Sequence, residues 1–430
     1  MTTLFGWVTA LTIWRLIAAR LVAYPSDTVS PDLSTATSAM RGRDSHSFDW
    51  MRFAVHDLIY HDIYPVPEWL HTRKDITDQE MSDIVSRTQD ARAIGYEVPR
   101  PYDVLVHDPG RRGGSLRGTR EGSGSVERPP LFRPHVRTLA IPEKYFYHLH
   151  DDVYISSPEY LFVQMASVLR DPVLIAVLGC ELTGCYALLP LGLVSLRRRK
   201  RERENDMENR SSIGFTDLFR ADGYVDCVPL TTVERIKQFI DAAPAYMRGV
   251  ASARATLSLI KDGSRSPMET VSSIQLRLGR RRGGFGAGEA FFNQRIDIKP
   301  EWREVLKKDY LLVDELFFSK SGGAWKCWTE TGRRAHTRKP KMVGAEYQGG
   351  YHAADWQMAA DNQRRLALED ESLVIYFITG RDFMDERVWN MIGERIARDV
   401  GHDYGELSEA LREKRSKVHA MLADPNLLKY

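Results

Sequence analysis

The fold of the C-terminal half of the chain is decided by the stretch YLLVDELFF, residues 310–318. A short run of apolar residues like this one is typical of a strand that is buried on at least one face. A charge inside such a strand costs free energy unless it is paired with an opposite charge or holds a cation. The carboxylate of Asp314 therefore marks this strand as part of a candidate functional site.

Two further carboxylates lie in neighbouring predicted elements. A strand predicted at 341–348 carries Glu346, and a helix predicted from Met268 to Leu278 carries Glu269 in its first turn. Carboxylate oxygens are ligands that Mg²⁺ prefers, so we expect Asp314 and Glu346 to hold Mg²⁺ and Glu269 to complete the cluster. An alternative remains for each residue. Ser266-x-x-Glu269 is a capping box, in which the Glu side chain serves only its own helix, and an ion pair with Lys or Arg would equally neutralise either strand carboxylate.

The sequence around these strands alternates between strand and helix patterns. Further strands are predicted at 291–298 and 373–379, and further helices at 353–368, 385–400 and 404–422. Asp297 lies in the first of these strands and is expected to face solvent. The pattern indicates an α/β arrangement in this half of the chain.

The first 228 residues divide by composition into three segments. Residues 1–105 are predicted to be mainly helical. Residues 106–196 are predicted to be α+β, with strands near 103–107, 135–141 and 152–155 and a helix that Ser157 caps and Pro158 opens. Residues 197–228 are dense in charge and predict a linker, which leaves 229–430 as the C-terminal domain.

Length and composition limit the class of protein. A chain of 430 residues with 43% hydrophobic and 27% charged residues indicates a globular protein of two or three domains. The formal net charge of +2 creates no strong overall field, so any surface that binds nucleic acid must be locally basic. The four cysteines include no CxxC pair, which favours a reducing cytoplasm over a disulfide framework or a zinc site.

Two apolar segments have the length of membrane signals. Residues 4–21 contain Arg15 and Arg20 and have no basic region before them, so they predict an amphipathic helix packed on a domain, not a signal peptide. Residues 173–196 are long enough to span a bilayer, but an ionised Glu181 near the centre would be costly there. We interpret this segment as a buried helix, a glycine-centred turn and a strand, and we expect no membrane location.

Two basic segments lie close in sequence to the acidic residues. Residues 319–340 combine two tryptophans with several cations, among them Lys326, Arg333 and Arg334. Cations beside aromatic rings suit a surface that follows a phosphate backbone and stacks on bases, although a solvated hairpin with packed tryptophans is the alternative. A second basic loop follows the Glu269 helix and holds Arg280, Arg281 and Arg282. We expect both loops to flank the acidic site.

Taken together, these residues form a recognisable pattern: a helix Glu, a strand Asp, and a strand ending in Glu-x-Gln with Gly and His after it. Its members here are Glu269, Asp314, Glu346-Tyr347-Gln348-Gly349 and His352, followed by a polar helix with Arg364 and Arg365. Over about residues 230–400 the chain resembles the very-short-patch-repair-like branch of the PD-(D/E)XK nuclease superfamily. Residues 153–166 and 181–186 resemble the abortive-infection antitoxin-like middle region of actinobacterial proteins of unknown function.

The resemblance implies an α/β fold with a restriction-endonuclease-like core, a mixed sheet flanked by helices, preceded by a smaller α+β domain. It also implies a metal-dependent DNA endonuclease in which Gln348 positions water, His352 activates water or contacts phosphate, and Arg364 and Arg365 hold phosphates. Gln348 stands where a standard member carries Lys, and an amide adds no charge that could stabilise the transition state. The alternative is a catalytically inactive, antitoxin-like regulator that binds DNA. Neither interpretation requires a small-molecule cofactor.

Overall fold

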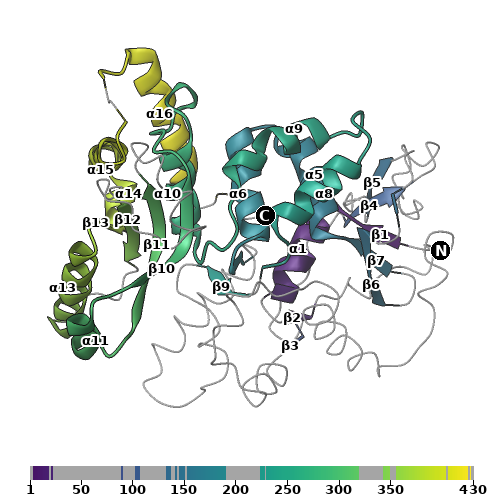
Figure 1. Ribbon diagram of the computed structural model, residues 1–430. Helices are drawn as coiled ribbons and strands as arrows, with labels where there is room; N and C mark the ends of the chain where they lie inside the picture. The colour runs from purple at the N-terminus through teal and green to yellow at the C-terminus, as the bar shows by residue number, and fades with distance from the viewer. Residues whose placement is uncertain are drawn as a thin grey trace, which may run out of the picture. The chain divides into compact units, whose positions relative to one another are not determined.

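The computed structural model describes residues 3–18, 21–22, 89–90, 102–106, 132–136, 141–142, 145–150, 153–189, 223–227, 229–318, 342–348, 355–402, 405–424 and 427. The chain divides into two compact units (Figure 1). Unit 1 comprises residues 1–178, 185–257 and 429–430, and unit 2 comprises residues 179–184 and 258–428. Within the described ranges, no helix combines the length and the apolar character that a membrane span requires.

Unit 1 contains a five-stranded sheet in the order β5-β4-β1-β7-β6. Its strands are β1 (Thr3–Phe5), β4 (Tyr102–Val106), β5 (Phe132–Val136), β6 (Phe146–His150) and β7 (Val153–Ser156). β1 runs antiparallel to β4 and parallel to β7, and β5 is an edge strand that runs parallel to β4. The described part of residues 1–105, predicted to be mainly helical, thus contributes strands β1 and β4 to this sheet. A two-stranded sheet pairs β2 (Leu21–Val22) with β3 (Gln89–Asp90).

Helix α5 (Pro158–Leu169), which Ser157 caps as predicted, contacts several other helices of unit 1. Helices α8 (Val233–Ala242) and α9 (Val250–Thr256) both contact α5. The buried carboxylate of Glu159 fastens α8 to α5, because it pairs with Arg235 Nε at 3.1 Å. The boundary predicted at residue 229 therefore lies upstream of the division between the units, which falls after residue 257.

The two apolar segments are both buried. The segment after residue 172 forms helix α6 (Pro172–Leu182), a turn and strand β8 (Tyr186–Leu188), which confirms the predicted helix, turn and strand. β8 pairs with β9 (Tyr224–Asp226). Helix α1 (Trp7–Ala18) is buried on nearly every side, and even its Arg15 side chain is buried. The helix was predicted correctly, but the prediction that it is amphipathic is wrong.

Unit 2 is built on a four-stranded mixed sheet in the order β10-β11-β12-β13. The strands are β10 (Ala290–Asp297), β11 (Tyr310–Phe318), β12 (Met342–Gln348) and β13 (Leu373–Thr379). β11 runs antiparallel to both of its neighbours, β10 and β12, whereas β13 runs parallel to β12. The helical elements are η7 (Leu257–Leu259), α10 (Pro267–Arg277), η8 (Arg280–Arg282), α11 (Pro300–Leu306), α13 (Asp355–Asp370), α14 (Gly380–Met384), α15 (Glu386–Asp399) and α16 (Glu409–Leu422).

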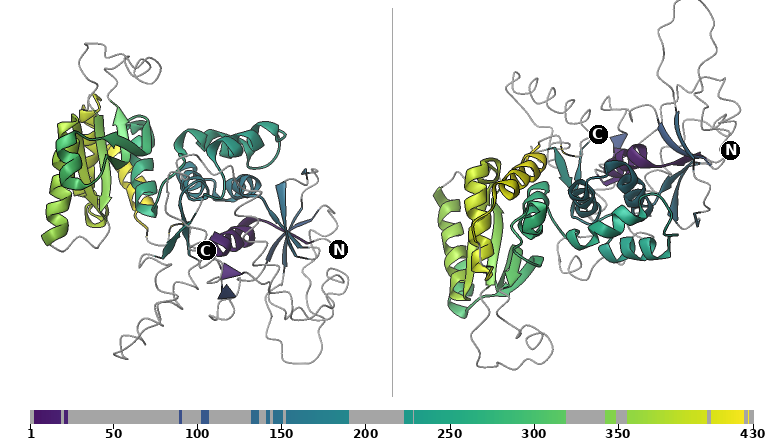
Figure 2. Two further views of the ribbon diagram at one scale, coloured as in Figure 1. Left: turned by 60° about the horizontal axis from the view of Figure 1, so that its bottom comes forward. Right: turned by 90° about the horizontal axis from the view of Figure 1, so that it is seen from above.

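Helices cover both faces of this sheet, with α10 and α13 on opposite sides (Figure 2). Leu368 of α13 packs in a core with Leu316 and Leu373 of the strands. On the other side, Gln275 of α10 accepts a hydrogen bond from Trp389 Nε1 of α15 at 2.8 Å. The sheet is therefore the middle layer of the unit, as the sequence pattern predicts in coarse form.

The sheet is irregular at Asp314. The paired positions of β10 and β11 include Phe292 with Glu315 and Gln294 with Val313, but not the intervening pair of Asn293 and Asp314. Asn293 has a φ of +51°, outside the extended region of a strand. The core on the α13 side contains both Val313 and Leu316, which strict alternation would place on opposite faces. The side-chain pattern of β11 thus shifts by one position across Asp314.

Candidate functional site

Asp314 lies at this irregular position, where the ladder between β11 and β12 ends. The last regular pair of the two strands is Glu315 with Ala345. Beyond it, the Asp314 carboxylate replaces the backbone ladder, since its Oδ2 accepts a hydrogen bond from the backbone N–H of Tyr347 at 2.9 Å. Burial raises the pKa of Asp314, and that hydrogen bond and the charges of Arg364 and Arg265 lower it only in part.

Glu346 lies near the end of β12, and its partner is a cation from the following helix. Its Oε1 accepts hydrogen bonds from Nη2 of Arg364 at 2.6 Å and from Nε at 3.1 Å. The same guanidinium also donates to the backbone carbonyl of Leu312 in β11. Arg364, expected to hold a phosphate, therefore binds a proposed metal ligand directly, as the ion-pair alternative predicts.

Glu269 makes hydrogen bonds at the start of its own helix and also lies near Asp314. The hydroxyl of Ser266 caps α10 by accepting from the backbone N–H of Glu269 at 3.2 Å. The Glu269 carboxylate reaches back past this cap, accepting from the N–H of Arg265 at 2.7 Å and from the Ser266 hydroxyl at 3.1 Å. Burial, followed by the nearby charge of Asp314, raises the pKa of Glu269 to about 8. The helix carboxylate and the strand carboxylate thus lie close enough to disfavour simultaneous ionisation.

A fourth carboxylate, Glu315, is also buried beside these residues, and the sequence analysis did not select it. Its Oε2 accepts a hydrogen bond from the hydroxyl of Tyr347 at 3.0 Å, while its Oε1 has no hydrogen-bond partner among the described residues. Burial raises the pKa of Glu315 to about 7, against the lowering effect of Arg277. The signal for Glu315 was available, because a strand with apolar residues on both faces must bury both members of an adjacent acidic pair.

Tyr347 connects the buried acids. Its backbone N–H binds Asp314, and its side-chain hydroxyl binds Glu315 on the α10 side of the sheet. Burial, together with the charge of Glu315, raises the pKa of the Tyr347 phenol well above its ordinary value. The phenol therefore remains a hydrogen-bond donor throughout the accessible pH range.

The two basic segments stand differently in relation to this site. Arg280, Arg281 and Arg282 form η8 at the C-terminal end of α10, whereas Glu269 is in its first turn. At about 1.5 Å per helical residue, about 12 Å of helix axis separates Glu269 from Arg277, the last residue of α10. Nη2 of Arg280 also donates to the carbonyl of Gly405 at 2.9 Å. The loop thus follows the end of α10 that is opposite to Glu269, and its place beside the acidic site stays a prediction.

The remaining predicted contacts lie partly outside the described residues. These are the insertion with Lys326, Arg333 and Arg334, together with His352 and the side chain of Gln348. The backbone of Gln348 is described and pairs with Thr379 of β13. Arg365 is exposed on α13, where its Nη2 donates to Asn362 Oδ1 at 2.9 Å. The Arg365 side chain thus bonds to a residue of its own helix and not to the buried carboxylates of the site.

The described residues thus bring together Glu269, Asp314 and Glu315 around Tyr347, with Glu346 held by Arg364. Among them, no group of three or more His, Cys, Asp or Glu side chains is arranged as a metal centre. Comparisons of the chain with protein-family models, with curated proteins and with solved structures find no match. Chemically, the site offers buried carboxylate oxygens whose negative charge is only partly compensated by arginines.

Proposed function

We propose that unit 2 is a metal-dependent phosphodiesterase of the PD-(D/E)XK type that acts on DNA, with Asp314 and Glu346 as its Mg²⁺ ligands. The order of elements supports this proposal, since a helix with Glu269 precedes a strand with Asp314 and a strand that ends in Glu346-Tyr347-Gln348. The sheet order β10-β11-β12-β13, with helices on both faces, agrees with the restriction-endonuclease-like core that the resemblance implies.

The observation that carries the proposal is the break in the ladder at Asp314. A carboxylate that replaces a backbone pair between two strands is fixed in position, and Oδ2 of Asp314 is held there by the N–H of Tyr347. Glu269 lies close to it on one side, and the guanidinium that holds Glu346 lies close to it on the other. Buried carboxylates that repel one another are suited to a divalent cation, which would compensate their charge.

The chain's own groups would act as follows. A divalent cation, when bound, would polarise a phosphoryl oxygen and neutralise charge on the leaving oxygen. Glu269 would remain at the edge of the cluster through its bond to the N–H of Arg265, and its ionisation would follow that of Asp314. Asp314 and Glu346 would hold the cation, and the guanidinium of Arg364, which pairs with Glu346, would supply positive charge to a phosphate.

The test is cleavage of supercoiled plasmid DNA by the full chain with and without Mg²⁺. We expect nicking that requires Mg²⁺ and disappears in Asp314→Asn and in Glu346→Gln. The matched control is Asp297→Asn, since the Asp297 side chain is 65% exposed at the far end of β10 and pairs only with Arg295 in the described residues. Retention of cleavage in Asp314→Asn would contradict the assignment.

One observation favours the second candidate, a DNA-binding regulator without cleavage. The guanidinium of Arg364 already neutralises Glu346 in the way a cation would, and Gln348 takes the place of the usual Lys. In that case plasmid DNA stays intact with every divalent cation, while DNA binding persists and weakens as the salt concentration rises. Mobility shifts on the same plasmid fragments at low and high salt distinguish this outcome from a loss of all interaction.

A further inference from the structure

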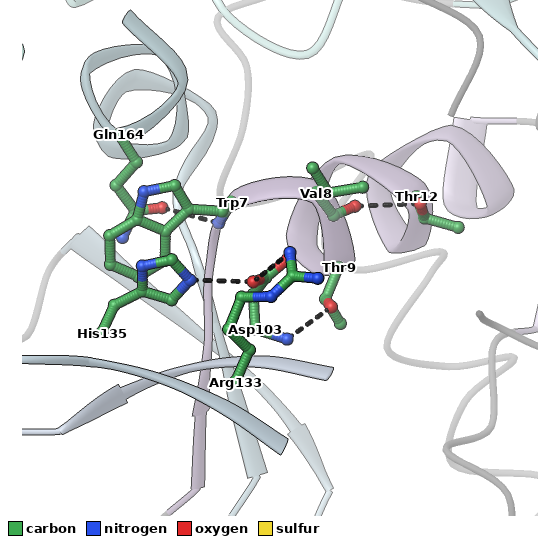
Figure 3. A network of polar contacts seen from close by, with 8 residues as sticks. All are labelled: Trp7, Val8, Thr9, Thr12, Asp103, Arg133, His135 and Gln164. Carbon is green, nitrogen blue, oxygen red and sulfur yellow. Dashed lines mark hydrogen bonds and ion pairs between the residues drawn. The ribbon is translucent and has the colours of Figure 1, made fainter. Parts of the chain in front are cut away.

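Unit 1 contains a polar cluster that is independent of the function proposed for unit 2 (Figure 3). Asp103 of β4 is only 2% exposed, and its Oδ1 lies 2.8 Å from Nε2 of His135. The same oxygen lies 3.5 Å from Nη1 of Arg133. The parallel register pairs Asp103 with Arg133 and Leu105 with His135, so all three polar side chains rise from the same face of the sheet.

The turn between β1 and α1 holds this cluster in place. Thr9 Oγ1 accepts a hydrogen bond from the backbone N–H of Asp103 at 2.8 Å. The ring of Trp7 stacks on the imidazole of His135 with centroids 3.8 Å apart and an interplanar angle of 16°. Trp7 has a φ of +48°, which is strained for a bulky residue, and its N–H is held by Oε1 of the buried Gln164 at 3.1 Å. Strain of this kind is found where a fold fixes a functional side chain.

The two ring nitrogens of His135 have different environments. Nε2 is bound to a buried carboxylate, which in a neutral imidazole places the proton on Nε2 and the lone pair on Nδ1. Nδ1 makes no hydrogen bond to the described residues, and the side chain is 27% exposed. A carboxylate at one nitrogen and a lone pair at the other nitrogen is the arrangement of a general base.

We propose that Asp103, Arg133 and His135 form a second active site that hydrolyses a phosphodiester, with His135 as the general base and Arg133 as the group that binds the phosphate. Nδ1 of His135 takes a proton from water as the water oxygen bonds to phosphorus. The bond from phosphorus to the leaving oxygen breaks on the opposite side of phosphorus. The leaving oxygen takes a proton from solvent, and the imidazolium gives its proton to solvent. The step consumes only water, and Asp103 acts as a positioning residue through Nε2.

The charges of the cluster select the substrate class. The guanidinium of Arg133 is 57% exposed and can present donors to two phosphate oxygens. The buried carboxylate of Asp103 offsets that positive charge, so the cluster with a neutral imidazole has no net charge. The exposed guanidinium of Arg133 is thus the one cation that the cluster presents to a substrate, and its single positive charge matches the single negative charge of a phosphodiester.

The experiment follows hydrolysis of bis(4-nitrophenyl) phosphate by the full chain in EDTA, which separates this site from the cation site proposed for unit 2. We expect turnover that is kept in Asp314→Asn and that falls about 100-fold or more in His135→Gln, the scale of a lost general base. Arg133→Gln should mainly raise KM, whereas Arg254→Gln is its control, because Arg254 is a similarly exposed arginine of unit 1 that also pairs with an aspartate.

A chemical readout separates catalysis from a structural role. Diethyl pyrocarbonate should modify His135 readily and the buried His419 hardly at all, as mapped by mass spectrometry, and Asp103→Asn should slow the modification of His135. Circular dichroism checks that each variant is folded. If His135→Gln does not fold, the hydrolysis rate of Arg133→Gln decides whether the cluster is catalytic. The proposal is overturned if the wild-type chain shows no turnover in EDTA, or if folded His135→Gln or Arg133→Gln hydrolyses the diester as the wild type does.

Discussion

Replacing Glu269 by Gln should remove a loss of stability that the protein otherwise suffers in alkaline solution. The Glu269 carboxyl is buried beside Asp314, which raises its pKa from 4.5 to about 8. A group with a raised pKa binds its proton more tightly in the folded state than in the unfolded chain. Its contribution to stability is therefore fully present below pH 4.5 and is lost as the pH rises to about 8.

The magnitude follows from the two values. At about 1.4 kcal/mol for each pH unit, the rise from 4.5 to about 8 corresponds to about 5 kcal/mol of unfolding free energy. In Glu269→Gln the amide oxygen can still accept from the N–H of Arg265, but the side chain has no proton to lose in this range. We therefore expect the variant to match the wild type only below pH 4.5, to be more stable by about 2 kcal/mol at about pH 6, and to be more stable by about 5 kcal/mol at about pH 9.

The measurement is urea unfolding in EDTA at about pH 6 and about pH 9, followed by tryptophan fluorescence for both proteins. The difference in unfolding free energy between variant and wild type is compared at the two pH values. Groups that titrate identically in both proteins do not contribute to this comparison. Asp297→Asn is the control, since its exposed carboxylate should leave the pH dependence unchanged. An equal loss of stability between the two pH values in wild type and Glu269→Gln would refute the reasoning.

Three further predictions concern the same unit. Mg²⁺ should raise the melting temperature more at about pH 9 than at about pH 6, because protons compete with it for the buried acids; differential scanning fluorimetry should show no rise in Asp314→Asn. Tyr347→Phe deprives Glu315 Oε2 of its hydroxyl donor and should cost about 1–3 kcal/mol; an unchanged urea midpoint would exclude this role. Gly393→Ala places a methyl group 2.5 Å from the Phe285 ring and should cost about 1–3 kcal/mol despite the better helix propensity of Ala; calorimetry showing a stabilised variant would contradict the close packing.

The strands of unit 2 could be predicted where an apolar run ends at clear breaks. The predicted bounds of β11 and β13 agree with the structure at both ends. Helix α11 was not predicted, because Pro300–Leu306 spans too few turns for a periodic pattern to stand out. The helix before β10 was predicted within one residue at each end, since Ser266 and Pro267 are strong signals of a helix start.

The sequence was enough to select several residues of the candidate site, but it did not predict which of them contact one another. A charge inside an apolar strand was enough to select Asp314, but nothing in the sequence indicates that the strand is irregular there. The pairing of Glu346 with Arg364 joins residues that are 18 positions apart, and it depends on how the helix α13 returns to the sheet. Such contacts are set by tertiary packing, which a local pattern does not encode.

The irregular position of Asn293 also affects how the molecule meets other molecules. β10 is an edge strand of its sheet, and a straight edge offers a row of N–H and C=O groups on which a foreign strand could add. The positive φ of Asn293 interrupts that row in its middle, and its amide is turned inward to the carbonyl of Gly263 at 2.7 Å. The exposed ion pair of Arg295 and Asp297 lies on the half of the edge that follows Asn293. The bend that frees Asp314 from the ladder thus also protects the protein from edge-to-edge aggregation.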